Sequence, residues 1–227
     1  MRRSVFAVAG LFMWLVVAPV ATSASDTHRE ARSLAQRALV CLQHGEDETD
    51  PDAKRTAYDE GLALARRAAE LDDDNADAHF AIFANEGRLM LLDGITPNPI
   101  SLLKVNNELE RALEIDPNHS DALAAKGGLY RQLPWALGGS LSVAEECLTK
   151  AIASDPNAVS ARIELAATYR DMGQPDRGLP LLDKAVIIAE RQGKRRQLAE
   201  ARTLLSELQA NDHRSALARG GNASGVH

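Results

Sequence analysis

The side chains that could carry catalytic or metal chemistry are scattered along this 227-residue chain and form no motif. None of the six histidines belongs to a His-Glu-x-x-His pair that would hold zinc, and the two cysteines are far apart. No glycine-rich phosphate loop with its lysine occurs. The acidic runs 46–48 and 72–74 lack the ligand spacing and central glycine of a calcium loop. We therefore expect a protein that is not an enzyme, with no cofactor and no metal.

Three arginines offer recognition chemistry instead. A guanidinium binds a carboxylate through two parallel hydrogen bonds, so Arg88, Arg131 and Arg170 could receive the carboxylates of a peptide terminus or an anionic solute. They could also pair with internal acids such as Glu86 or Asp171, because helix surfaces commonly carry neighbouring opposite charges. The sequence leaves both interpretations open.

The net charge narrows the choice of partner. The formal charge is −6 at pH 7, from 26 basic and 32 acidic residues, and it falls to −8 if a segment containing Arg2 and Arg3 is removed. Nucleic acids and anionic membrane surfaces are bound through a cationic footprint, so both are disfavoured. We expect a protein or peptide partner, or else a small organic acid or apolar ligand, and no nucleic acid.

Residues 1–24 are laid out like a secretory signal peptide. Arg2 and Arg3 precede an apolar run over residues 5–17, and small residues at 21–24 form a cleavage site. The run is shorter than the ~20 residues that a membrane span requires. We expect cleavage after residue 24, a periplasmic or secreted protein, and no stable membrane insertion afterwards; an uncleaved anchor is the alternative.

Helical periodicity and its breakers predict four pairs of helices and a ninth helix over residues 195–211 that covers the open end of the stack. The tail, residues 212–227, has three glycines and no apolar period, so we predict that it is disordered. The predicted pairs cover residues 27–44 with 53–71, 76–93 with 100–115, 120–133 with 141–154, and 158–172 with 176–192.

These pairs repeat with a similar phase along the chain. Ala68, Ala112, Ala151 and Ala185 recur in the second helix of successive pairs, at steps of 44, 39 and 34 residues. Helical hairpins at such a period stack side by side rather than forming a single deep core. Between pairs, Asp-Pro-Asn stops one helix, and we expect its asparagine, Asn118 or Asn157, to cap the next.

The repeats resemble the tetratricopeptide repeat (TPR) family, in its exported bacterial type. The resemblance implies an all-α, right-handed superhelical solenoid of about four helical hairpins and a C-terminal capping helix, forming one domain over residues 25–211. The matching positions are Gly127, Tyr130, Ala144, Leu148, Ala151 and Pro156 in the third pair, and Leu165, Ala166, Tyr169, Gly173, Gly178, Leu182 and Ala185 in the fourth.

The resemblance also implies a binding surface, because the first helix of each TPR pair lines the concave face. It places Arg88, Arg131 and Arg170 on that face, with Phe80 and Ile163 as an apolar floor, although core packing is the alternative for a phenylalanine there. We expect a non-catalytic scaffold or adaptor of the periplasm or cell envelope that binds a partner segment in this groove.

The connection inside the third pair is longer than the family's. Trp135 and the run from Leu137 to Ser140 look like the connection in TPR partners of TRAP-type transporters, and regulator-of-microtubule-dynamics proteins have a similar long connection. This resemblance implies an accessory solute- or ligand-binding protein as the alternative function. In it the long connections of the second and third pairs, residues 94–99 and 134–140, close a pocket that is edged by Trp135, Gly138, Gly139 and Ser140. The plainer interpretation is a packed turn in which the tryptophan covers its hairpin.

Overall fold

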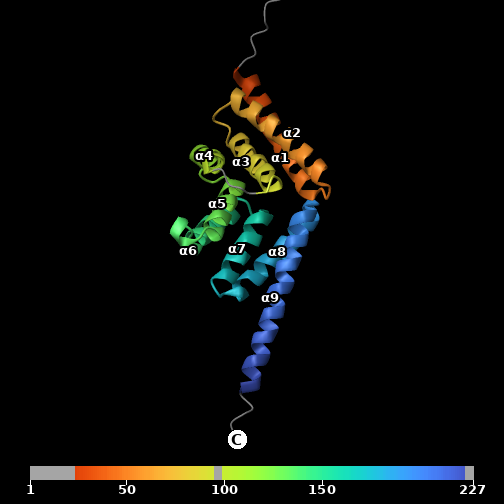
Figure 1. Cartoon of the computed structure of the whole chain (residues 1–227), viewed down its shortest axis with the longest axis vertical. Helices are drawn as coiled ribbons and strands as arrows, with labels where there is room; N and C mark the ends of the chain where they lie inside the picture. Colours follow the sequence, from red (N-terminus) through yellow and green to blue (C-terminus); the bar gives the residue numbers. More distant parts are fainter. Residues whose placement is uncertain (1–23, 95–98, 223–227) are drawn as a thin grey trace, which may run out of the picture.

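The computed structural model describes residues 24–94 and 99–222, with side chains described for 24–94 and 104–210. The predicted signal peptide lies outside these residues, apart from Ala24, where the first helix begins. Every regular element of the described chain is a helix (Figure 1). None of the described helices combines the length and apolar character needed to cross a bilayer.

The helices follow the predicted order. They are α1 (Ala24–Asp47), α2 (Pro51–Leu71), α3 (Ala76–Leu92), α4 (Pro99–Ile115), α5 (Ser120–Gln132), α6 (Leu141–Ser154), α7 (Val159–Asp171), α8 (Pro175–Gln192) and α9 (Arg195–Asn222), with a short 3-10 helix, η1 (Trp135–Leu137), between α5 and α6. The predicted all-α solenoid of four helical hairpins and a capping helix is confirmed.

The end of α9 differs from the sequence expectation. We predicted that this helix stops at residue 211 and that a disordered tail follows, but the backbone remains helical to Asn222. The run from residue 214 to 219, Arg-Ser-Ala-Leu-Ala-Arg, is rich in strong helix formers, which favour continuation of the helix. Residues 223–227 lie outside the description.

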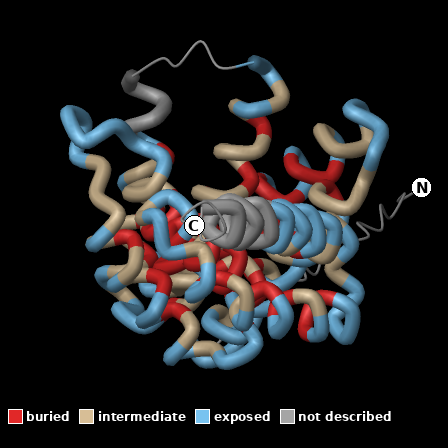
Figure 2. Tube along the Cα trace, turned by 90° about the horizontal axis from the view of Figure 1, so that it is seen from below, coloured by how far each residue is buried: buried red, intermediate tan, exposed pale blue. Residues whose placement is uncertain are grey.

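The hairpins stack in chain order. The first helices contact each other between the first and second pairs, α1 against α3, and between the third and fourth, α5 against α7, and α9 packs on α7 and α8. Buried residues are concentrated between the helices, while the outer faces are exposed (Figure 2). The second and third pairs are joined mainly where α3, α4 and α5 meet, around Phe80, Leu109 and Ala122.

Small residues allow the paired helices to approach closely, as the TPR resemblance implies. A Cβ at Gly127 of α5 would lie 2.5 Å from Leu148 Cγ of α6, and one at Gly178 of α8 would lie 3.2 Å from the carbonyl oxygen of Ala166. Ala144 is fully buried in the same interface. Since these contacts leave no room for a larger side chain, helix spacing is set by residue size.

The asparagines that we expected to cap the helices after the turns, Asn118 and Asn157, do not occupy the cap positions. The carboxylate of Asp116 accepts the backbone N–H of Asn118 (2.9 Å), and the cap of α5 is the next residue, His119, whose Nδ1 accepts the N–H of Ala122 (3.2 Å). Asp155 binds the N–H of Asn157 in the same way. The aspartate before each proline therefore organises the turn, which shifts the helix start beyond the asparagine.

The solenoid curls until its two ends meet. The Asp47 carboxylate at the end of α1 accepts the backbone N–H of Arg196 in α9 (2.8 Å), and Glu46 pairs with the Arg196 guanidinium (2.9 Å). In Figure 1 the start of α9 lies against the lower end of α1 and α2. Repeats of a solenoid ordinarily touch only their neighbours, so this contact closes the curve around its concave face.

Candidate functional site

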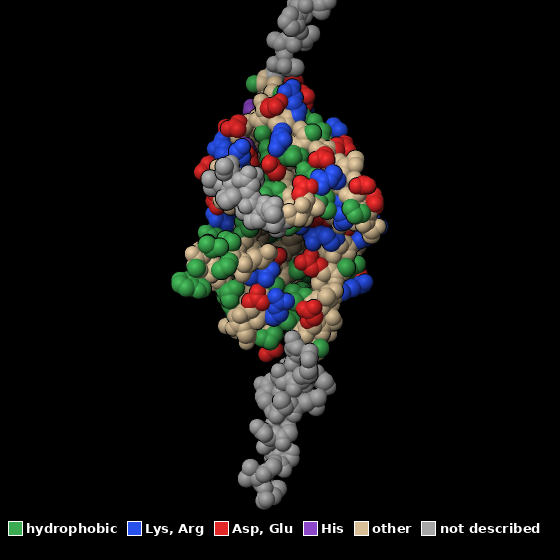
Figure 3. Space-filling model, in the orientation of Figure 1, with side chains coloured by type: hydrophobic (Ala, Val, Ile, Leu, Met, Phe, Trp, Pro, Cys, Tyr) green, Lys and Arg blue, Asp and Glu red, His purple; other side chains and the backbone are tan. Residues whose placement is uncertain are grey.

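A cavity of about 1220 Å³ lies on the concave side, between the inner helices. Its walls come mainly from α1, α3, α5 and α7, the first helix of each pair, with further residues from α4 and from the start of α9. In Figure 3 the surface is hollowed between the upper part of the molecule and the lower part, with acidic and basic side chains along the rim. The first helices thus line the concave face.

One side of the cavity is apolar. Leu42 of α1, Phe83 of α3 and Leu129 of α5 are half-buried there, and Phe80 and Ile163 lie deeper in the wall. Phe80 also packs on Phe83, with ring centroids 6.2 Å apart, and belongs to the core between α3, α4 and α5. Phe80 therefore lines the cavity, as predicted, and also packs in the core. The half-buried Leu42, Phe83 and Leu129 expose more of their surface to the cavity than Phe80 and Ile163 do.

Gly87 leaves open space in the α3 wall. It faces the cavity in the middle of the helix, and a Cβ built there would meet nothing within 4 Å. Glycine in a helix interior is less favourable than alanine by about 1 kcal/mol. Neither a close helix contact nor a positive φ requires this glycine, so its effect is to widen the cavity.

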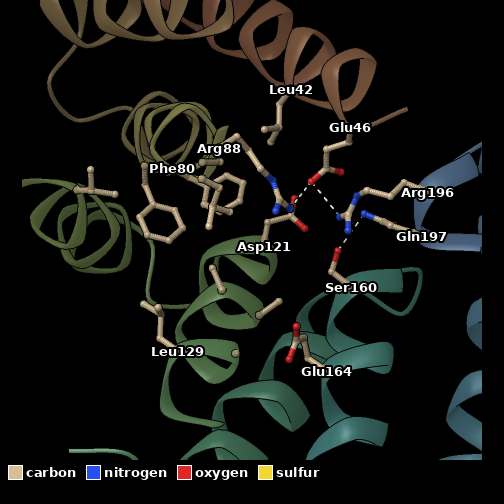
Figure 4. Close-up of a pocket in the computed structure, with 18 of the residues that line it drawn as sticks. Leu42, Glu46, Phe80, Arg88, Asp121, Leu129, Ser160, Glu164, Arg196 and Gln197 are labelled. Carbon is tan, nitrogen blue, oxygen red and sulfur yellow. Dashed lines mark hydrogen bonds and ion pairs between the residues drawn. The ribbon is translucent and has the colours of Figure 1, made fainter. Parts of the chain in front are cut away.

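A charged cluster around Glu46 forms the opposite side (Figure 4). Its carboxylate, only 11% exposed, pairs with Arg88 of α3 and with Arg196 of α9, the latter at 2.9 Å. Burial lowers the pKa of Arg196, but Glu46 and Glu200 outweigh it and raise that pKa above its ordinary value. Glu46 therefore joins three helices that are remote in sequence.

The other two predicted arginines are also paired internally. Arg131 Nε lies 2.9 Å from Glu164 and its Nη1 lies 3.1 Å from Asp171, which also holds Arg170 at 3.0 Å. Arg131 lines the main cavity, and Arg170 lines an adjoining hollow of about 300 Å³. Four of the five residues predicted for the concave face therefore line one cavity, namely Phe80, Arg88, Arg131 and Ile163. Each of the three predicted arginines forms an ion pair with an acidic residue of the protein itself.

The internal partners are only partly those the sequence suggested. Asp171 does pair with two of the three predicted arginines, but Glu86 binds Arg66 of α2 at 3.1 Å rather than Arg88. The partner of Arg88 is Glu46, which lies in a different hairpin. No spacing rule connects positions so far apart, so the sequence carried no signal for this pair.

Asp121, at the start of α5, was not singled out from the sequence. It is exposed inside the cavity, and within the described part of the chain no ion pair or side-chain hydrogen bond holds its carboxylate. Desolvation of the carboxylate by the surrounding walls raises its pKa, an effect that the charge of Lys194 partly opposes. Nearby, Gln197 donates to Ser160 Oγ (3.0 Å) while its own Oε1 is buried without a partner in the described structure.

Residues 134–140 of the long connection in the third pair lie outside the cavity lining. Trp135 is 88% exposed, so it does not cover its hairpin. Gly138 has a φ of +90°, and a Cβ at Gly139 would overlap the backbone of Leu133. Ser140 caps α6 by accepting the N–H of Val143 (3.4 Å). The two glycines and the serine therefore shape the turn, and the tryptophan projects into solvent.

The family comparison covers the first half of this architecture. The family described as "Regulator of microtubule dynamics protein 1-3" matches residues 20–135, from before α1 into the long connection after α5. The chain belongs to this family. The RMD1-3 match includes the helices that contribute Glu46, Gly87 and Asp121, so three of the cavity walls lie in the matched region.

Several solved TPR structures are similar to this RMD1-3 family member in fold alone. MamA from Desulfovibrio magneticus RS-1 is 17% identical, with 83% of this chain and 98% of MamA covered and a TM-score of 0.44. The TPR protein TTC0263 from Thermus thermophilus is 19% identical over 79% and 98% of the two chains, with a TM-score of 0.48. YrrB, described as a TPR protein with an unusual peptide-binding site, is 21% identical over 61% and 81%, with a TM-score of 0.33. No curated protein matches the chain.

Proposed function

We propose that this protein is a non-catalytic scaffold that binds a segment of a partner protein in the cavity between its inner helices. The observation that carries the proposal is the cavity itself, about 1220 Å³ in volume and lined by the first helix of every pair. Small-molecule pockets usually measure roughly 300–1,000 Å³. The larger volume suits several side chains of a polypeptide.

The apolar side of the cavity supplies a reason for binding. Leu42, Phe83 and Leu129 are only half-buried, so a guest that covers them removes apolar surface from water. Such burial stabilises a complex by roughly 25 cal/mol per Å² before the costs of association. The open space at Gly87 lets a guest side chain approach the α3 backbone.

The transporter-accessory alternative is supported by no contact of the described structure. It predicted a closed pocket edged by Trp135, but that side chain is exposed and is not part of the cavity lining. The RMD1-3 family name, which refers to the regulation of another protein assembly, agrees with a role in protein contact. We therefore prefer a protein segment to a small solute as the guest.

We also propose that the protein works in the periplasm or cell envelope, because residues 1–24 have the layout of a signal peptide. The intact mass of the protein purified from its native host tests this. A mature chain that begins at Ser25 is expected, and a chain that retains residues 2–24 would contradict the cleavage.

Selection of peptides with and without a blocked cavity tests the binding proposal. Gly87→Trp fills open space, whereas Gly87→Ala leaves most of that space empty and serves as the matched control. A random peptide library displayed on phage is selected on each purified variant. Peptides that bind the wild type and Gly87→Ala but lose at least tenfold in affinity for Gly87→Trp are expected. Equal binding to all three proteins would refute the cavity as the binding site.

A further inference from the structure

The charge of the cavity lining is acidic. Four basic residues line it, Arg88, Arg131, Lys194 and Arg196, against six acidic ones, Glu46, Asp47, Asp93, Asp121, Glu164 and Glu200. Complementary charge across an interface selects partners and speeds their encounter. The excess of carboxylates favours a guest that brings positive charge.

The three arginines of the lining are already engaged. Arg88 and Arg196 share Glu46, and Arg131 binds Glu164 and Asp171. A guest carboxylate would have to displace one of these internal acids and leave it in the wall without its partner. Removing one member of a buried pair costs more than the pair itself contributes. The arginines are therefore poor receptors for an anionic guest.

Two acceptors at the polar end of the cavity lack a donor within the described residues. Asp121 has no ion pair there, and the Oε1 atom of Gln197 is buried without a hydrogen bond. Figure 4 shows Asp121 projecting from α5 towards the space between Arg88 and Gln197. Lys194 is close enough to influence the Asp121 carboxylate but forms no ion pair with it in the structure. Of the two, the Asp121 carboxylate is the one exposed to the cavity, so it is the acceptor that a guest donor can reach.

We propose that the partner segment is cationic and amphipathic, with a lysine or arginine that binds Asp121 while its apolar side chains cover Phe83 and Leu129. This inference rests on the proposed function, since it assigns the chemistry of the guest in the same cavity. Asp121 and Leu129 both lie on α5, about 12 Å apart along the helix axis, so one short segment reaches both. The arginines then act as ties between helices rather than as contacts for the guest.

The peptides selected on the wild-type protein separate this inference from the proposed function. If no selected peptide depends on the space at Gly87, the cavity is not a binding site and both proposals fail. If Gly87-dependent peptides are obtained but are acidic or uncharged, only the assignment of a cationic guest fails. Peptides that combine lysine or arginine with apolar residues are the expected result.

Asp121 is then tested with synthetic peptides of one selected sequence, carrying lysine, norleucine or glutamate at the basic position. Asp121→Asn should weaken the lysine peptide about tenfold, because a charge-assisted hydrogen bond is lost. Its affinity for the norleucine peptide should be unchanged. Asp93→Asn is the matched control, since Asp93 lines the same cavity but is already paired with Arg55.

Binding is measured by fluorescence anisotropy, and circular dichroism confirms that each variant is folded. Equal affinity of the lysine and glutamate peptides for the wild type would overturn the inference. The same conclusion would follow if Asp121→Asn and Asp93→Asn weakened the lysine peptide equally.

Discussion

Two buried histidines show how contacts at single residues fix proton positions. Both ring nitrogens of His79 face acceptors, with Nδ1 2.7 Å from Glu108 and Nε2 3.0 Å from the carbonyl oxygen of Asp73. Both bonds form only if the ring carries two protons. His119 differs, because its Nε2 donates to Asp77 (3.0 Å) while its Nδ1 accepts the N–H of Ala122. One proton satisfies both of its contacts.

The His79 contacts predict a pH-dependent contribution to stability. The hydrogen bond to Glu108 raises the pKa of His79 above its ordinary value of about 6.5, although burial opposes this. A raised folded-state pKa means that the stabilisation is complete below about pH 6.5 and is lost as the pH rises through the folded-state value. His79→Gln should therefore destabilise most near pH 6 and progressively less above it.

Urea denaturation of the wild type and His79→Gln at several pH values measures this difference. Asp73 and Arg111 also contact this region, and Arg111 pairs with Asp73 at 3.2 Å. Arg111→Gln is therefore a control for a general change in local charge. A destabilisation by His79→Gln that does not change with pH would show that the ring is not doubly protonated in the folded protein.

Replacing glycine by alanine should change the unfolding free energy in opposite directions at two positions of the inner helices. Gly127→Ala places a Cβ 2.5 Å from Leu148 Cγ and should cost about 1–3 kcal/mol of unfolding free energy through overpacking. Gly87→Ala meets no atom within 4 Å and should stabilise by up to about 1 kcal/mol through helix propensity. Chemical denaturation compares them, and a loss of stability at Gly87 would mean that its surroundings are more crowded than the structure shows.

At the scale of elements, two substitutions in the connection between α5 and α6 distinguish the contribution of turn geometry to stability from that of side-chain packing. Trp135→Ala should change the unfolding free energy by less than about 0.5 kcal/mol, because the indole is almost fully exposed. Gly139→Ala should destabilise clearly, since its Cβ would overlap the backbone of Leu133. Thermal denaturation of both variants measures this. A large loss with Trp135→Ala would instead support packing of the tryptophan on its hairpin.

Most elements could be predicted because their signals are local. Apolar periodicity and prolines such as Pro117 and Pro156 mark helices and their ends within a few residues. The helix caps were harder to predict, because Asp116 accepts the N–H of Asn118 and His119, not Asn118, caps the next helix. Which of two neighbouring polar side chains caps a helix depends on the turn geometry, and the sequence pattern does not state it.

The sequence predicted which residues line the candidate site, but not which residues form ion pairs with them. TPR resemblance implied that Arg88 and Arg131 share the concave face, and both line the cavity. Their pairing with Glu46 and Glu164 joins different hairpins and follows from how the solenoid curves. Asp121 stands out only because the other acidic residues of the cavity lining have partners within the described structure. Such information is absent from any local pattern.

At the scale of the whole molecule, the contact between α1 and α9 holds the solenoid in a closed curve. The first N–H groups of a helix have no partner within that helix. In α9 the N–H of Arg196 is satisfied by Asp47, 2.8 Å away and on the opposite end of the stack. This single amide therefore reports whether the two ends are in contact.

Glu46→Gln should open that contact. Glu46 holds Arg88 and Arg196 together, and replacing its charge leaves Arg88 without its ion-pair partner and Arg196 with Glu200 alone. Amide exchange at Arg196, followed by NMR, should accelerate at least tenfold while exchange in α5 and α6 stays unchanged. Glu200→Gln is the matched control, because Glu200 binds Arg196 within α9 at 3.0 Å and does not reach α1. If Arg196 remains protected in Glu46→Gln, the curvature is set by the packing of the hairpins alone, and the cavity stays closed on this side without the ion pairs.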